Sequence, residues 1–189
     1  MVWEMLDPLF KNYENLLLRV DTHVRTIAET YRDQIACKKG CDACCRFLNL
    51  FPVEAFSLSR AFLALPGHTR DRVIERVNDR EDHCPLLVDG ACLLYAERPV
   101  ICRTHGFPLY LEKQGQAMVD FCPENFKEMT ELPRDAMLDL NQLNTLLTAV
   151  NQHFIAHIDT ALPNRIPVSQ ALFLCRDIET DTEPGTQHS

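Results

Sequence analysis

The sequence predicts a mainly α-helical protein: a single helical domain with irregular cysteine-rich loops and a small β-hairpin. Two long segments of the 189-residue chain, one near each end, carry apolar residues at helical spacing. Eight of the nine cysteines lie between these segments. We therefore expect two long helices to pack together and to hold the cysteine-rich loops beside them.

Three helices are expected in the first half of the chain. Asp7-Pro8 is typical of a helix start, and the apolar stripe that follows predicts a long amphipathic helix over 8–34. A second helix is predicted over 53–65, where prolines lie on both sides. A third helix, short and very polar, is expected over about 69–80.

The second half begins with an expected irregular segment, residues 81–105. The sequence of 107–121 then predicts a β-hairpin, because two apolar runs flank a turn at Gly115. A long helix is predicted over 133–158, and a last short helix over 168–176. We expect one domain, residues 1–176, and a disordered acidic tail, residues 177–189.

Charge and hydropathy limit the possible partners. The net charge is −8 and no basic run is present, which argues against binding to a phosphate backbone. The N-terminal segment lacks the basic and apolar regions of a signal peptide. No apolar run approaches the ~18 residues that cross a bilayer. We therefore expect a cytoplasmic protein with no nucleic-acid and no membrane partner.

Cysteines kept reduced in a cytoplasm favour metal binding or catalysis over a disulfide framework. The densest run contains Cys37, Cys41, Cys44 and Cys45. Its spacings of two or three intervening residues let both sulfurs of a pair turn toward one ion. Gly40 permits a tight backbone there. Because neighbouring side chains point in different directions, the adjacent pair fits two neighbouring metal centres, or one ligand and one supporting thiol.

A second cysteine segment follows. Cys84 and Cys92 flank an Asp89-Gly90 turn signal that would bring the two thiols together. Cys175 stands alone in an apolar run and is expected to be a small core residue. The predicted metal ligands are the other eight cysteines: Cys37, Cys41, Cys44, Cys45, Cys84, Cys92, Cys102 and Cys122. The spacing leaves open whether they form one centre or two.

Several residues beside the cysteines are candidates to support the ligands. Ligating thiolates are negatively charged, so Arg98 and Arg103 are expected to donate hydrogen bonds to sulfur. His83 and His105 flank ligand cysteines, and each could replace a thiolate or donate to one. Tyr95 is expected to pack over the cysteine region.

Residues 84–103 read C-P-L-L-V-D-G-A-C-L-L-Y-A-E-R-P-V-I-C-R. Together with the preceding run that ends in Cys-Cys, this pattern resembles the YkgJ-type cysteine-cluster family of bacteria, which is described as zinc- or iron-chelating. Glu54 also sits where that family tends to have a glutamate. The three residues between Cys37 and Cys41 depart from the two found in many members. The resemblance covers roughly residues 37–122 and implies a thiolate metal site.

Other thiol chemistries fit less well. The C-x3-C-x2-C spacing also occurs in radical S-adenosylmethionine enzymes, but these need a (β/α) barrel that the sequence does not predict. A dithiol redox pair would be expected near a βαβ unit, which is also missing from the predicted elements. No nucleotide-binding glycine loop or serine-hydrolase elbow occurs, and no catalytic residue is identified.

Two functions remain open. The first is a protein that holds an iron–sulfur cluster or iron, for redox or group-transfer chemistry with a partner enzyme; the Cys-Pro pairs at 84–85 and 122–123 favour it. The second is a non-enzymatic zinc-binding module that acts as a carrier or interaction domain.

Overall fold

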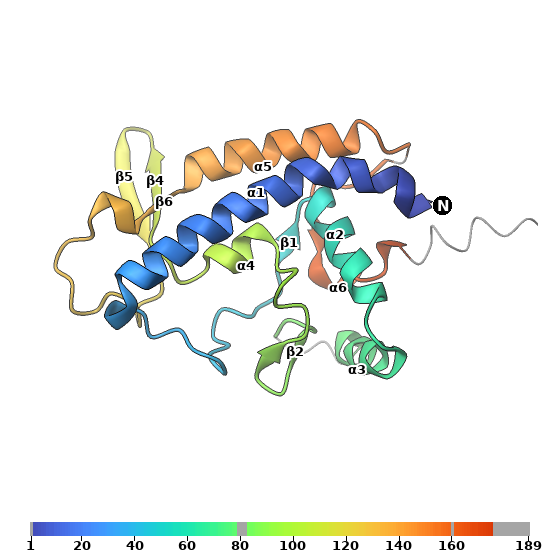
Figure 1. Cartoon of the computed structure of the whole chain (residues 1–189), viewed down its shortest axis with the longest axis horizontal. Coiled ribbons are helices and arrows are strands. Elements are labelled where there is room, and N and C mark those ends of the chain that lie inside the picture. Colours follow the sequence, from blue (N-terminus) through green and yellow to red (C-terminus); the bar gives the residue numbers. More distant parts are fainter. Residues whose placement is uncertain (1, 79–82, 160, 176–189) are drawn as a thin grey trace, which may run out of the picture.

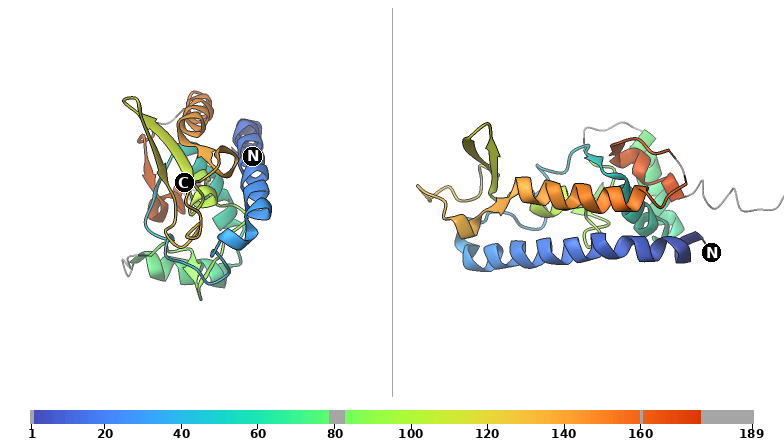
Figure 2. Two further views of the ribbon diagram at one scale, coloured as in Figure 1. Left: turned by 90° about the vertical axis from the view of Figure 1, so that its left-hand side faces the viewer. Right: turned by 90° about the horizontal axis from the view of Figure 1, so that it is seen from above.

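Two long antiparallel helices lie side by side along the long axis of the molecule. The computed structural model describes residues 2–78, 83–159 and 161–175. Helix α1 spans Val2–Thr30 and helix α5 spans Leu140–Ile155. They run in opposite directions, and Figure 1 and both views of Figure 2 show them as neighbours.

The contact between α1 and α5 is apolar, as the two helical stripes predicted. Phe10 and Tyr13 of α1 are buried against Phe154 of α5. The ring centroids of Phe10 and Phe154 are 5.2 Å apart, and Phe56 lies 5.5 Å from Phe154. Burying one such side chain contributes about 1.5–3 kcal/mol. The expectation that the two long helices pack together is therefore confirmed.

The bounds of α1 differ from the prediction at both ends. The helix begins at Val2, so Pro8 lies inside it rather than in its first turn, at the loss of one backbone hydrogen bond. Leu6 packs against the core and gives the added turn an apolar contact. At the other end, α1 stops at Thr30 and a short 3-10 helix, η1, follows at Arg32–Gln34.

The second long helix starts later than predicted. Residues 134–136 form a 3-10 turn, η2, and Leu138–Asp139 forms strand β6 instead of the first turns of a helix. Helix α5 begins at Leu140, where the Asp139 carboxylate accepts a 3.0 Å hydrogen bond from the backbone N–H of Gln142. Residues 138–139 pair with a strand distant in sequence, β4 (Leu109–Lys113), instead of following the local helical pattern.

Helices α2 and α3 follow the prediction closely. Helix α2 spans Pro52–Leu63 against an expected 53–65, with proline in its first turn. Helix α3 spans Gly67–Asn78. Its expected end near residue 80 lies outside the described residues.

A second apolar core lies below α2. Strand β1, Asn49–Leu50, pairs antiparallel with strand β7, Ile166–Pro167, and leads into helix α6, Val168–Ala171. Phe62 of α2 and Val73 of α3 are buried in this core. The expected helix over 168–176 is thus shorter than predicted, and the tail from residue 177 lies outside the described residues.

The predicted β-hairpin is confirmed. Strands β4, Leu109–Lys113, and β5, Gln116–Asp120, pair antiparallel around Gln114-Gly115. Both turn residues have positive φ (53° and 76°), as a two-residue hairpin turn requires. Strand β6 adds parallel to β4, which gives the order β5-β4-β6.

The segment expected to be irregular, 81–105, contains regular structure. Strands β2, Leu87–Val88, and β3, Ala91–Cys92, form a small hairpin. Helix α4, Val100–Thr104, follows Pro99 and packs against α1. Residues 81–82 lie outside the description. In the part of the chain that is described, no helix has both the length and the apolarity needed to cross a bilayer.

Candidate metal centre

The first cysteine run and the β2–β3 hairpin lie in contact. The backbone N–H of Cys84 donates a 3.1 Å hydrogen bond to the carbonyl of Cys45. At the tip of the hairpin, a Cβ added to Gly90 would lie 3.9 Å from the Cα of Gly40. Two segments about forty residues apart in sequence therefore meet along their backbones.

Four half-buried thiols gather where these segments meet, and we call them the inner set: Cys45, Cys84, Cys92 and Cys102. Cys84 precedes strand β2 in a turn in which its carbonyl accepts a 3.0 Å hydrogen bond from the N–H of Leu87. Cys92 lies opposite Leu87 across the hairpin. Cys102 lies in helix α4.

Burial dominates the electrostatics of the inner set. It raises the pKa of the Cys84 thiol to about 11 and that of Cys102 to about 12, and it also raises the pKa values of Cys45 and Cys92. Negative charge on any thiol of the set further raises the pKa of its neighbours, and every pair in the set interacts in this way. Burial and the mutual effect of charge therefore both disfavour ionisation of these four thiols without a cation.

Cys37 and Cys122 meet at a different place, around Gly106. A Cβ on Gly106 would lie 3.3 Å from the sulfur of Cys37 and 3.7 Å from the Cβ of Cys122. Gly106 also has a φ of +88°, which favours glycine. The absence of a side chain at this position lets the two cysteine-bearing segments approach each other.

Asn125 holds this second place together. Its side chain is 1% exposed. The amide nitrogen donates to the Gly106 carbonyl at 2.7 Å and to the Cys37 sulfur at 3.4 Å, while its oxygen accepts from the Ala36 N–H at 2.9 Å. Sequence analysis missed both Asn125 and Gly106. The one local sign was the position of Asn125, three residues after Cys122.

The remaining two thiols lie in consecutive turns. The N–H of Cys41 donates to the Lys38 carbonyl at 3.0 Å, and that of Cys45 donates to the Asp42 carbonyl at 2.8 Å. The pKa of Cys44 is raised first by burial and then by the neighbouring Cys45, Cys37 and Cys41 thiols. We call the other four predicted ligands the outer set: Cys37, Cys41, Cys44 and Cys122.

The chain matches one known family over this region. Residues 36–123 match the family model CxxCxxCC, described as "Putative zinc- or iron-chelating domain". We call the matched segment, residues 36–123, the CxxCxxCC domain. It contains all eight cysteines of the two sets, in agreement with the resemblance to the YkgJ-type family, and Cys175 lies outside it. No curated protein and no solved structure matches the chain.

Within the CxxCxxCC domain, Arg98 is the cation that acts on most thiols of the inner set. Its guanidinium lies 3.5 Å from the ring centroid of Tyr95 and donates to the carbonyls of Tyr95 (2.9 Å) and Cys102 (3.4 Å). Its charge partly offsets burial by lowering the pKa values of Cys45, Cys92 and Cys102. Tyr95 itself is exposed, so it covers Arg98 rather than the thiols.

Arg103 has a different role from the predicted one. Its side chain is buried and donates to the Asp21 carboxylate of α1 and to the carbonyls of Ala96 and Arg98. The three hydrogen bonds go to oxygen, because a guanidinium in this turn faces the carbonyls of the preceding loop. Arg103 thus fixes the loop that carries Arg98 against α1.

The two candidate histidines differ. Residues Arg46 and His83 form an isolated antiparallel bridge, and the Nε2 of His83 lies 3.2 Å from an Arg46 guanidinium nitrogen. His105 has a buried Nδ1 with no hydrogen-bond partner among the described residues. His105 immediately precedes Gly106, beside the outer set.

Glu54, the glutamate suggested by the family resemblance, does not lie among the thiols. It is buried at the start of α2 and accepts hydrogen bonds from the N–H groups of Phe51 (3.1 Å) and Val100 (3.0 Å). Burial raises its pKa. Since Val100 starts the helix that carries Cys102, Glu54 links α2 to the inner set.

The donor atoms of the domain suit a thiophilic metal, although the side chains are not closed around one point. Across the described ranges, no three Cys, His, Asp or Glu side chains form a metal-binding group. The eight cysteines of the two sets are free thiols. Sulfur donors select zinc and iron–sulfur clusters among common metal groups. Cys175, as expected, is buried in the apolar core between α1, α2 and α5.

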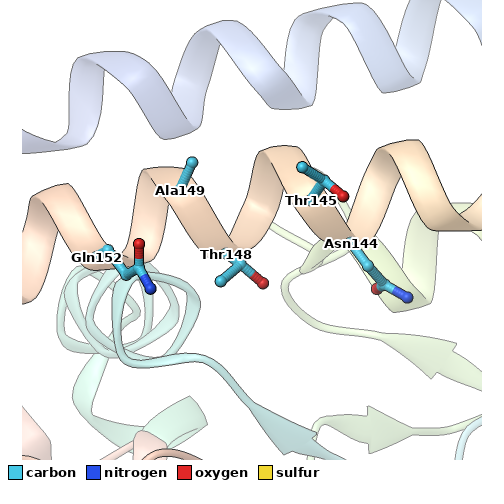
Figure 3. A pocket seen from close by; sticks show the side chains of 5 residues that line it. All are labelled: Asn144, Thr145, Thr148, Ala149 and Gln152. Atoms are coloured by element: carbon cyan, nitrogen blue, oxygen red, sulfur yellow. The ribbon is translucent and has the colours of Figure 1, made fainter.

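A shallow depression on α5 offers no alternative site. It is lined by the neutral side chains of Asn144, Thr145, Thr148, Ala149 and Gln152, which Figure 3 shows on successive turns of the helix. The lining includes no cysteine, histidine or charged group.

Proposed function

We propose that this chain binds iron or zinc through the thiolates of its CxxCxxCC domain, with the inner and outer sets as the ligands. The observation that carries this proposal is the inner set, four half-buried thiols on segments that meet through the Cys84–Cys45 backbone hydrogen bond, the β2–β3 hairpin and Arg98. Burial opposes ionisation of these thiols, so without a cation the half-buried arrangement does not stabilise thiolates. A bound cation would favour the ionised sulfurs and repay that cost. A cytoplasmic location, where thiols stay reduced, suits this function.

Iron, in the form of an iron–sulfur cluster, is the first candidate. Cys84-Pro85 and Cys122-Pro123 follow the habit of ferredoxin cluster ligands. The charge of Arg98 would offset thiolate charge, which is one of the levers that tune such centres. Bound iron would supply redox chemistry, and we propose a protein partner that uses it for electron or group transfer.

Zinc is the second candidate, favoured by the β2–β3 hairpin. Cys84 and Cys92 flank a turn at Asp89-Gly90, where both residues have positive φ (51° and 72°). Hairpin-borne cysteine pairs and short C-x2-C runs are common in structural zinc sites. In this case the chain is a zinc carrier or an interaction domain folded by its metal.

Metal and acid-labile sulfide, measured on protein purified without oxygen, test the proposal. Iron with a matching amount of sulfide supports the first candidate, and zinc without sulfide supports the second. The Cys175→Ser variant is the matched control, because its sulfur lies in the apolar core, and it is expected to keep the wild-type metal content. A purified, folded chain that holds neither metal, and takes up neither when offered, contradicts the proposal.

A further inference from the structure

The two sets of thiols are supported differently. Three thiols of the inner set are carried by elements that pack on apolar cores: Cys84 and Cys92 lie against the core below α2, and Cys102 lies in α4, whose Val100 is buried against α1 and α5. Cys45 is tied to them by the backbone hydrogen bond from Cys84. The outer set has three exposed thiols, those of Cys37, Cys41 and Cys44. Because the inner thiols are half-buried and most of the outer thiols are exposed, we expect metal bound by the two sets to exchange with solution at different rates.

Local contacts assign five of the eight cysteines to their sets. The Cys84-to-Cys45 hydrogen bond and the β2–β3 pairing draw Cys45, Cys84 and Cys92 together. Independently, Gly106 and Asn125 draw Cys37 and Cys122 together. Neither group of contacts uses a residue of the other.

The vicinal pair lies on the boundary. Cys44 is exposed and Cys45 is half-buried. The two thiols interact with each other; Cys44 also interacts with Cys37 and Cys41, and Cys45 also interacts with Cys92. The N–H of Arg46 donates to the Cys44 carbonyl at 3.0 Å, a tight turn that fixes the backbone at the pair. An exposed thiol next to a half-buried one suits two neighbouring centres, because a single centre would draw both sulfurs to the same side.

We propose that the domain holds two metal centres: a stable inner centre on Cys45, Cys84, Cys92 and Cys102, and an exchangeable outer centre on Cys37, Cys41, Cys44 and Cys122. This inference rests on the proposed function and assigns a different role to each of the two centres. The inner centre stabilises the fold around the hairpin and α4. The outer centre, with three ligands open to solvent, exchanges its metal with small chelators or with another thiol protein.

Cobalt(II) is a suitable probe, because it occupies zinc- and iron-type thiolate sites and its absorption reports sulfur ligation. The metal-free, reduced chain is titrated with Co²⁺ under anaerobic conditions, and a chelator is then added. We expect saturation at about two Co²⁺ per chain, both sulfur-bound, because eight thiolates complete two tetrahedral sites. Release to the chelator is expected in two phases of similar amplitude, with the fast phase from the outer centre.

Single substitutions identify the phases. Cys41→Ser and Cys44→Ser lie in exposed turns, so the fold should survive, and each should reduce binding to about one Co²⁺ and remove the fast phase. Cys92→Ser should remove the slow phase, provided that circular dichroism shows a wild-type helical signal. Cys175→Ser should keep both phases.

Different failures of this experiment have different meanings. If the wild-type chain binds no Co²⁺ through sulfur, the proposed function fails. If it binds Co²⁺ with saturation at one ion per chain, in a single release phase that Cys41→Ser and Cys44→Ser abolish, a thiolate site exists but the division into two centres is wrong. Loss of the slow phase in Cys41→Ser, with the fast phase retained, would overturn the assignment of the sets.

Discussion

Segments 36–49 and 83–104 both carry cysteines, yet they are held in the fold in different ways. Segment 83–104 buries Leu86, Leu94 and Val100 in two apolar cores. Segment 36–49 has no buried residue at all, and its order depends on turns, on the contact with Cys84 and on Asn125. Apart from the partly buried Leu48, segment 36–49 lacks the apolar burial that usually offsets the entropy of ordering a loop. It is therefore the segment that most needs a metal.

Removal of the metal should give the largest effect. We expect a chelator to raise hydrogen exchange and protease cleavage strongly in 36–49, and much less in 83–104, because only the latter keeps its apolar anchors. The helices α1 and α5 should retain their circular dichroism signal. Equal loosening of both segments would contradict the comparison, and a collapse of the helical signal would show that the metal supports the whole fold.

Asn125→Ala should come next in size. It leaves the buried Gly106 carbonyl without its partner, which costs about 1–3 kcal/mol, and it also removes the acceptor of the Ala36 N–H. We expect a lower free energy of unfolding and faster proteolysis in 36–49, with 83–104 unchanged. Asn141→Ala is the matched control, because its exposed amide also donates to a carbonyl. The same loss in both variants would speak against a special role for Asn125.

Glu54→Gln tests the other segment through a pH dependence. Burial raises the folded-state pKa of Glu54, so its contribution to stability is fully present below the unfolded value near 4.5 and is lost as the pH rises through the folded value. Glutamine removes this titration. The stability of the wild type relative to the variant should therefore fall as the pH increases from about 4 to 7. Denaturant unfolding at several pH values measures it; a constant difference would contradict the pKa shift.

Arg98→Gln is expected to have the smallest effect on stability and to act only on the inner set. Loss of its charge near Cys45, Cys92 and Cys102 should weaken inner-set metal affinity, by roughly tenfold for a residue that supports ligands without binding metal. The outer set should be unaffected. Competition with a coloured chelator measures both affinities, and Arg46→Gln is the control at the His83 bridge.

Sequence periodicity predicted the parts of the fold that depend on local order. The α1 and α5 stripes and the hairpin at Gly115 are encoded within single segments, and the structure confirms them. The start of α5 was wrong by several residues because β6 pairs with β4, almost thirty residues earlier. Local patterns carry no information about such a partner.

The candidate site divides in the same way. Cysteine spacing and the Asp89-Gly90 turn predicted that the chain folds back between Cys84 and Cys92, and the β2–β3 hairpin forms there because the turn is local. The roles of Asn125 and Gly106 could not be predicted, since each acts on Cys37 from a distant part of the chain. For Arg103, charge next to a cysteine suggested a sulfur contact, but the carbonyls of its own loop are nearer.

The hydrogen bond between Cys37 and Asn125 joins residues separated by 88 positions, and this has a consequence during synthesis. At the usual pace of a ribosome, Asn125 is made roughly 4–18 s after Cys37. During that interval the first cysteine run is outside or near the exit tunnel without the residue that positions it. The nascent thiols can meet oxidants and stray cations before their site exists. The order of translation thus favours completion of the outer set last, once the chain beyond residue 125 has emerged.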